Sequence, residues 1–182
     1  MDRAKQIIRA MGDLVGIQFA NTNHLGVNFW HDFQRLGVLS DCFVDVGANV
    51  GQWANEARQH YPSVTIFSIE PESESFTSLR QRFQNDPYHH AIQCAASDQI
   101  ATAELRVSGG TTNSLESRWT PLLGPAERSI TIRTDTIDHI AQRFNLKHIA
   151  LLKIDVEGHE LQCMNVSRVL AKCFKRDALT LC

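Results

Sequence analysis

The sequence has no long uninterrupted apolar run, and this absence limits where the protein can work. None of its apolar stretches approaches the roughly 20 residues that a helix needs to cross a bilayer. Residues 1–20 mix charged residues into apolar ones that recur at helical spacing, whereas a signal peptide needs a continuous apolar core. We therefore expect a cytoplasmic protein with an N-terminal helix and no membrane span.

Paired cysteines and an excess of positive charge are also missing. The five cysteines are odd in number and form no CxxC pair, which favours reduced thiols over a disulfide framework or a zinc site. A net charge of −2 offers no basic surface, so we expect no nucleic-acid partner. The 182 residues are enough for one domain with a real core and hardly enough for two.

What the sequence does contain is an alternation of buried strands and amphipathic helices. Compact apolar runs predict strands at 42–47, 64–70, 91–97, 148–155 and 178–182. Apolar residues at helical spacing predict helices at 28–40, 50–61, 73–83, 136–144 and 160–173. Pro87 predicts a loop that leaves His89 and His90 in solvent. The short links are typical of an α/β fold with a mainly parallel sheet, doubly wound by helices on both faces.

The alternation breaks between residues 100 and 133. Segments 102–108 and 129–134 alternate like half-exposed antiparallel strands, and the segment between them is rich in Gly, Thr, Ser and Pro. We predict an inserted hairpin or sheet edge with a long loop. Such loops in compact domains are usually functional or disordered. We expect residues 108–125, together with the N-terminal helices, to cover a substrate.

The turn DVGANVG after the first strand is the first candidate for chemistry. Open parallel sheets bind ligands beyond the carboxyl ends of their strands, and Gly47 and Gly51 let a ligand approach the backbone. Asp45 would repel a pyrophosphate, and the third glycine of GxGxxG is missing, which disfavours a nicotinamide-dependent oxidoreductase. Glu70, at the next strand end, can accept both hydroxyls of a ribose. For the glycines alone, a tight turn is the alternative.

These motifs, with AASD, TNSLE, TIDHI and LLKIDVEGHE further along, resemble the FkbM family of S-adenosylmethionine-dependent methyltransferases from about Cys42 to Leu161. The resemblance implies a Rossmann-like fold of the class I methyltransferase type. It also implies S-adenosyl-L-methionine as cofactor and O-methylation of a small molecule, sugar or lipid-like acceptor, glycans included.

The same resemblance assigns cofactor-binding roles residue by residue. Four residues would surround the methionine part of the cofactor: Asp45, Gly47, Asn49 and Gly51. Glu70 would hold the ribose, with Pro71 and Glu72 shaping the next turn, and Ser97 and Asp98 would lie near the adenine. For Asp98, a helix cap or turn is an equal alternative.

The segment DVEGHE carries the candidate catalytic residues. Asp155, at the end of the fourth strand, would lie beside the methyl-transfer centre, and His159 could take the acceptor's proton because imidazole has a pKa of about 6.5. A metal site is disfavoured because no partner motif follows downstream. Alternatively, Glu157 and Glu160 start the next helix and His159 is solvated. Lys153 could pair with Asp45 or Asp155 or lie at a partly open face.

The resemblance fades after Leu161, so we expect the sheet to lack the family's last two strands. We predict one methyltransferase-like domain over 1–182, with a helical cap at 1–40 and a C-terminally incomplete Rossmann-like core at 41–182. The alternative function is a non-catalytic, methyltransferase-like binding module. The oligomeric state is not indicated.

Overall fold

The computed structural model describes residues 29–35, 42–108, 113–116, 128–147, 149–164 and 179–181. The chain divides into two compact units, Met1–Val38 and Leu39–Cys182. In the first unit, helix α2 (Phe29–Arg35) lies inside the predicted range 28–40, and its Trp30 and Phe33 are buried. The predicted helix within 1–20 falls outside the described residues. None of the described helices is long and apolar enough to span a bilayer.

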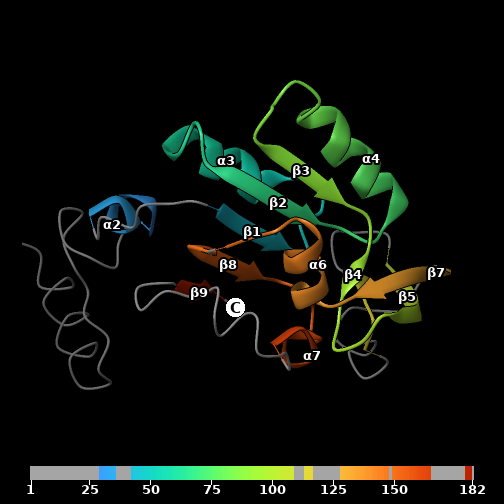
Figure 1. Ribbon diagram of the computed structural model, residues 1–182. Coiled ribbons are helices and arrows are strands. Elements are labelled where there is room, and N and C mark those ends of the chain that lie inside the picture. The colour runs from blue at the N-terminus through green and yellow to red at the C-terminus, as the bar shows by residue number, and fades with distance from the viewer. Residues whose placement is uncertain are drawn as a thin grey trace, which may run out of the picture. The chain divides into compact units, whose positions relative to one another are not determined.

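The second unit is built on a parallel sheet of five strands (Figure 1). Its strands, in the order β3-β2-β1-β8-β9, are β3 (His89–Ile92), β2 (Thr65–Ile69), β1 (Cys42–Val46), β8 (Leu151–Ile154) and β9 (Leu179–Leu181). Every neighbouring pair is parallel. Apart from the third, each predicted strand is confirmed within its predicted range.

Helices cover both faces of this sheet, which explains why the strands are apolar on both sides. They are α3 (Gln52–His60), α4 (Ser73–Arg82), α6 (Ile137–Arg143) and α7 (Glu160–Met164). On one face, Val44 and Val46 share a buried core with Ile137 and Ile140 of α6. On the other face, the ring of Phe43 meets Trp53 of α3 at a centroid distance of 6.2 Å. The mixed α/β class is therefore confirmed.

The predicted third strand is wrong in its extent. Strand β3 starts at His89, and the run breaks after Ile92, so that β4 (Ala95–Ala96) joins a different sheet. His89 and His90 therefore belong to a strand and not to the predicted loop. His89 is partly buried, with its ring stacked 4.0 Å from that of Phe83 and its Nε2 at 2.9 Å from the Ser68 hydroxyl.

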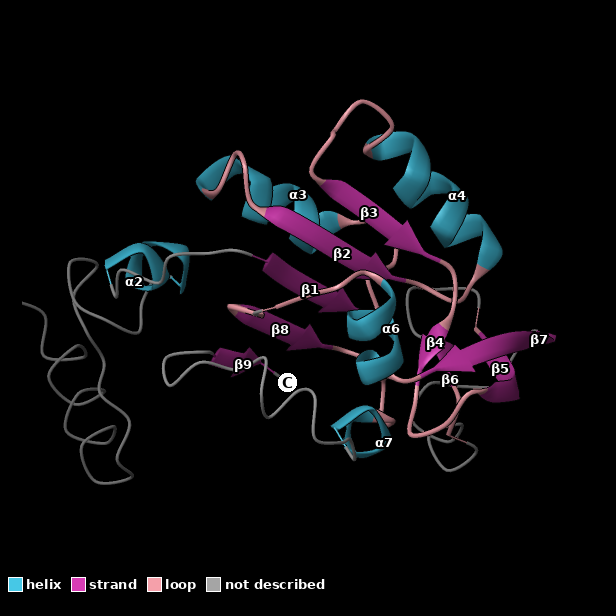
Figure 2. Cartoon of the chain, in the orientation of Figure 1, coloured by secondary structure: helices cyan, strands magenta, loops and turns pink. Residues whose placement is uncertain are grey.

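The predicted insertion forms a second sheet of its own. Strands β4, β5 (Ala101–Val107), β6 (Asn113–Ser114) and β7 (Arg128–Asp135) pair in the order β4-β7-β5-β6. The antiparallel pairing of β5 with β7 confirms the predicted hairpin, and Leu105 and Ile132 belong to a separate small core. Figure 2 shows this sheet beyond the arrowheads of the parallel strands. It therefore stands at the edge where parallel sheets bind ligands.

Candidate functional site

A cavity of about 460 Å³ opens at the carboxyl ends of β1, β2 and β8. Strand order reverses there, because the chain runs outward from β1 to β3 and later places β8 on the other side of β1. The parallel-sheet wall of the cavity includes Val46, Gly47, Asn49, Glu70, Lys153 and Asp155. The second-sheet wall consists of Ala95, Ala96, Leu105, Asn113 and Leu115.

The two glycines of the first turn serve different contacts. Gly47 has a φ of 74°, and a Cβ on it would overlap the backbone carbonyl of Asp155. Gly51 has a φ of 82°, and its Cβ would meet the side chains of Leu79 and Phe83, each at 2.7 Å. Gly47 therefore lets the ends of β1 and β8 approach each other, whereas Gly51 lets α3 pack on α4.

Glu70 presents a buried carboxylate to the cavity. Its Oε2 accepts from the Asn49 N–H at 2.8 Å and its Oε1 from the Glu72 N–H at 2.9 Å. Burial raises the pKa of Glu70, and these two backbone hydrogen bonds oppose the rise. Since a carboxylate offers about four lone-pair sites, each oxygen can still accept one hydroxyl. Glu72 itself caps α4, accepting from the Glu74 and Ser75 N–H groups.

Lys153 links the two aspartates of the parallel-sheet wall. Its Nζ lies 3.0 Å from Oδ1 of Asp45 and 3.6 Å from Oδ2 of Asp155, so the predicted pairing with one of these aspartates is confirmed and extends to both. The same ammonium donates to the Gly47 carbonyl at 3.0 Å. Asp45 is fully buried; burial raises the pKa of its carboxyl, and Lys153 opposes the rise. Lys153 therefore balances the buried charge of Asp45 and lines the cavity, which Asp45 itself does not.

Asp155 begins a tight turn that returns the chain into α7. Glu157 and Gly158 both have positive φ, at 52° and 100°. Oε1 of Glu160 accepts from the Gly158 N–H at 3.1 Å and from the Val156 N–H at 3.3 Å. Burial, with Asp155 and Glu160 nearby, raises the pKa of Glu157. The turn is therefore held from inside by one carboxylate, and the side chain of Asp155 is left 65% exposed.

Strand β6 and the residues after it hold the same turn from outside. The Ser114 hydroxyl donates to the Glu157 carbonyl at 2.7 Å and accepts from the Glu116 N–H at 3.0 Å. Oε1 of Glu116 lies 3.0 Å from Nδ1 of His159. We call these contacts the β6 lock. The other ring nitrogen of His159, Nε2, lies 3.0 Å from the Ser97 hydroxyl, so both nitrogens are engaged.

The structure brings together some of the predicted site residues and separates others. Five of them line the cavity: Gly47, Asn49, Glu70, Asp155 and His159. Four others do not: Asp45 lies behind Lys153, Gly51 faces α4, Ser97 is buried beside His159, and Asp98 is exposed near Leu161. Within the described residues, no three metal-ligating side chains are grouped as a metal site.

Sequence reasoning missed the side chains of the second-sheet wall. Leu105, Asn113 and Leu115 line the cavity, although they lie in the insertion. The TNSLE motif contributes to the family resemblance and gives no prediction of its own about the site. The motif has three polar residues before Leu115 and does not alternate, so the sequence carries no periodic signal for this wall.

Comparisons with known proteins show the family to which the chain belongs. The pattern of the methyltransferase FkbM domain matches residues 45–174. The chain is also similar to a protein named Methyltransferase 1 from Beauveria bassiana (strain ARSEF 2860). The two are 25% identical over an aligned stretch of 139 residues, which covers 66% of this chain. The chain spans about half the length of that relative, 56% of it.

Proposed function

We propose that this chain, which belongs to the FkbM methyltransferase family, transfers a methyl group from S-adenosyl-L-methionine to an oxygen of a small-molecule or glycan acceptor. The observation that carries the proposal is the Glu70 carboxylate at the floor of a strand-end cavity, with acceptor capacity to spare on both oxygens. The strand order of the parallel sheet supports a Rossmann-like fold of the class I methyltransferase type.

The residues present fit this cofactor. The cavity volume lies in the range of about 300–1,000 Å³ that is common for small-molecule and cofactor sites. Glu70 would hold the ribose hydroxyls, and Gly47 and Asn49 would lie along the methionine part. Asp45 and Gly51 do not line the cavity and would contribute indirectly. Asp45 would do so through its ion pair with Lys153, and Gly51 by letting α3 pack on α4. The apolar second-sheet wall suits the adenine, with Ser97 and Asp98 beyond it.

The chain's own contribution to catalysis would be positioning and proton acceptance. The bound cofactor supplies a methyl group on a sulfonium, which is transferred in line to the acceptor oxygen. Asp155 is the exposed carboxylate at this end of the cavity and would bind the acceptor hydroxyl or accept its proton. His159 is the second candidate base; one of its bonds, to Ser97 or Glu116, would have to open first.

Calorimetric titration with S-adenosylhomocysteine tests the cofactor assignment. We expect Glu70→Ala to weaken binding at least about tenfold, because the ribose hydroxyls lose a charged acceptor. Glu56→Ala, an exposed carboxylate on α3 outside the cavity, is the matched control and should bind like the wild type.

Turnover is tested with methyl-labelled S-adenosyl-L-methionine and a panel of sugars, phenols and lipid-like alcohols. Label in an acceptor oxygen supports the enzyme. If the cofactor binds and no acceptor on the panel is methylated, the result favours the non-catalytic binding module. A wild-type protein that does not bind S-adenosylhomocysteine contradicts the cofactor proposal itself.

A further inference from the structure

We propose that Asn113, on the second-sheet wall, recognises the adenine base by accepting a hydrogen bond from its exocyclic amine. This inference rests on the proposed function and adds a residue that determines which nucleobase the site accepts. The side-chain oxygen of Asn113 is buried and has no hydrogen-bond partner within the described part of the chain. A buried amide oxygen left unpaired is costly, and a ligand donor would relieve that cost.

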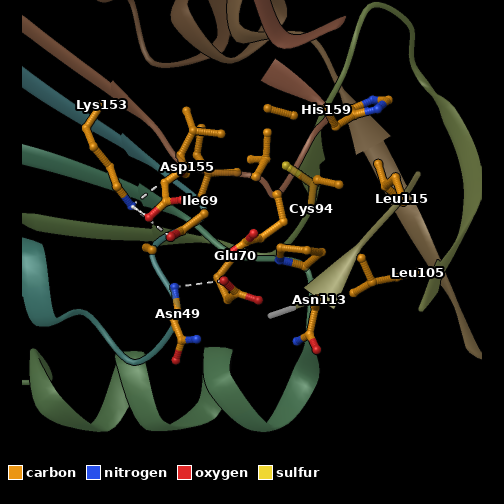
Figure 3. Close-up of a pocket in the computed structure, with 18 of the residues that line it drawn as sticks. Asn49, Ile69, Glu70, Cys94, Leu105, Asn113, Leu115, Lys153, Asp155 and His159 are labelled. Carbon is orange, nitrogen blue, oxygen red and sulfur yellow. Dashed lines mark hydrogen bonds and ion pairs between the residues drawn. The ribbon is translucent and has the colours of Figure 1, made fainter. Parts of the chain in front are cut away.

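The position of the ribose decides on which side the base must lie. In a nucleoside, the base on C1′ and the 5′ carbon on C4′ are attached at opposite ends of the ribose ring. Glu70 would hold the ribose, and the sulfonium at the 5′ end must reach Asp155. Figure 3 shows Glu70 with Asp155 and Lys153 on one side, and with Asn113 and Leu105 on the other. The base is therefore directed to the second-sheet wall.

The chemistry of that wall fits a purine with a hydrogen-bonding edge. Its other side chains, Ala95, Ala96, Leu105 and Leu115, are apolar and can pack against the faces of a flat ring. Asn113 is the polar residue among them. An amide oxygen accepts from the N6 amine, and the amide nitrogen can donate to a neighbouring ring nitrogen, a pairing that asparagine commonly makes with adenine.

The residue that sequence comparison favours for this role is less well placed. Asp98 is exposed and belongs to a surface depression with Leu161 and Met164, outside the cavity. Ser97 is 5% exposed, and its hydroxyl is engaged by His159. Asn113 combines what the adenine edge needs: a place in the cavity and an unpaired acceptor.

The test is a calorimetric double-mutant cycle with the full chain. Two ligands are titrated: S-adenosylhomocysteine and its 6-deamino analogue, which carries hydrogen in place of the N6 amine. They are compared on the wild type, Asn113→Leu, Asn113→Ala and the control Asn55→Leu, which makes the same change on the exposed face of α3. We expect the wild type and Asn55→Leu to prefer the adenine ligand about tenfold, because the unpaired amide otherwise stays buried.

In the Asn113 variants, that preference should fall to about twofold or less, mainly through loss of affinity for S-adenosylhomocysteine. If Asn113→Leu does not fold, the ratio of the two ligand affinities is measured on Asn113→Ala instead. The ratio for the wild type is measured without any variant. A wild type that binds both ligands equally overturns the inference. The inference is also overturned if the Asn113 variants keep the full preference for the adenine ligand. The same holds if Asp98→Ala loses this preference and the Asn113 variants do not. Failure of the wild type to bind either ligand instead overturns the proposed cofactor.

Discussion

The two walls of the cavity differ in how directly the positions of their residues follow from the sequence. On the parallel-sheet wall, Asn49, Glu70 and Asp155 follow the ends of their strands within three residues, and Lys153 lies one position before the end of β8. On the second-sheet side, contacts join residues far apart in sequence: Glu116 and His159 are 43 positions apart, and Ser97 and His159 are 62 apart. Contacts on the first wall are also long in sequence, since Lys153 and Gly47 are 106 positions apart. What differs is that the strand-end positions of the first wall follow from local patterns, whereas the contacts of the second wall have no such local sign.

The walls also differ in what they bury. The parallel-sheet wall buries charge, since Asp45 is fully enclosed and paired with Lys153, and Glu70 is 5% exposed. Apart from Asn113, the second-sheet wall is apolar, and the β6 lock behind it uses mostly hydrogen bonds. Unpairing a buried charge costs more than losing a neutral hydrogen bond. The comparison therefore predicts larger effects on the parallel-sheet side.

The largest effect is expected at Gly47. Gly47→Ala would combine a strained positive φ with overlap against the Asp155 backbone, and we expect it to lower the free energy of unfolding by at least about 3 kcal/mol. The backbone carbonyl cannot move without separating β1 from β8. Urea unfolding followed by circular dichroism measures the change.

Gly51→Ala is the matched variant, because it carries the same kind of φ strain. Its Cβ meets the ends of Leu79 and Phe83, which can shift, so a smaller loss of about 2 kcal/mol is expected. Equal losses in the two variants would show that backbone strain, and not the close approach of the strand ends, decides both.

The sequence predicts the parallel-sheet wall well for a physical reason. Strands buried on both faces are continuous apolar runs, and the polar residue that ends such a run marks the strand end, as at Glu70 and Asp155. Family resemblance then supplied the roles. It could not show that Lys153 lies between Asp45 and the cavity or that Gly51 serves helix packing, because both depend on the register of neighbouring strands and helices.

The second-sheet wall was predicted only as a hairpin with a loop. Periodicity identified β5 and β7, but the two-residue strands β4 and β6 are too short to give a periodic signal. The break after Ile92, which moves β4 into the other sheet, left no local signal either. Glu116 contacts His159 across the fold, and Asn113 lines the cavity only once the second sheet has formed.

The next prediction concerns how stability depends on pH, and it again involves a residue of the parallel sheet, His89 in β3. Burial lowers the pKa of His89 to about 4; Asp86 opposes this shift, and Arg58 adds to it. The unfolded chain therefore binds a proton near pH 6.5 that the folded chain does not bind until about pH 4. Stability is thus lost as pH falls through this window, by about 2–3 kcal/mol from this group.

His89→Gln should flatten that part of the profile, because glutamine can still bond to the Ser68 hydroxyl and does not titrate. Urea unfolding at intervals between pH 7 and pH 4 measures the difference. His90→Gln, with an exposed side chain in the same strand, is the control and should keep the wild-type slope. If His89→Gln loses stability on acidification as steeply as the wild type, the slope arises elsewhere.

The smallest effect is expected from the β6 lock, and it tests whether the second-sheet wall stabilises the turn after β8 at all. Ser114→Ala removes the hydroxyl that donates to the Glu157 carbonyl and accepts from Glu116, and we expect a loss of about 1–2 kcal/mol. Thr131→Val is the control, because its hydroxyl makes an equally short bond to Glu104 on the exposed side of the same sheet. That variant should lose less than about 0.5 kcal/mol.

Amide hydrogen exchange locates the effect of the lock. In Ser114→Ala, exchange should accelerate at Val156 and Gly158, whose N–H groups bond to Glu160 within the turn, and stay unchanged in the centre of β1. A uniform acceleration would mean that the two walls unfold as one cooperative unit. No acceleration, with stability equal to that of Thr131→Val, would mean that Glu160 alone holds the turn. The second sheet would then shape the cavity without supporting the turn that carries Asp155.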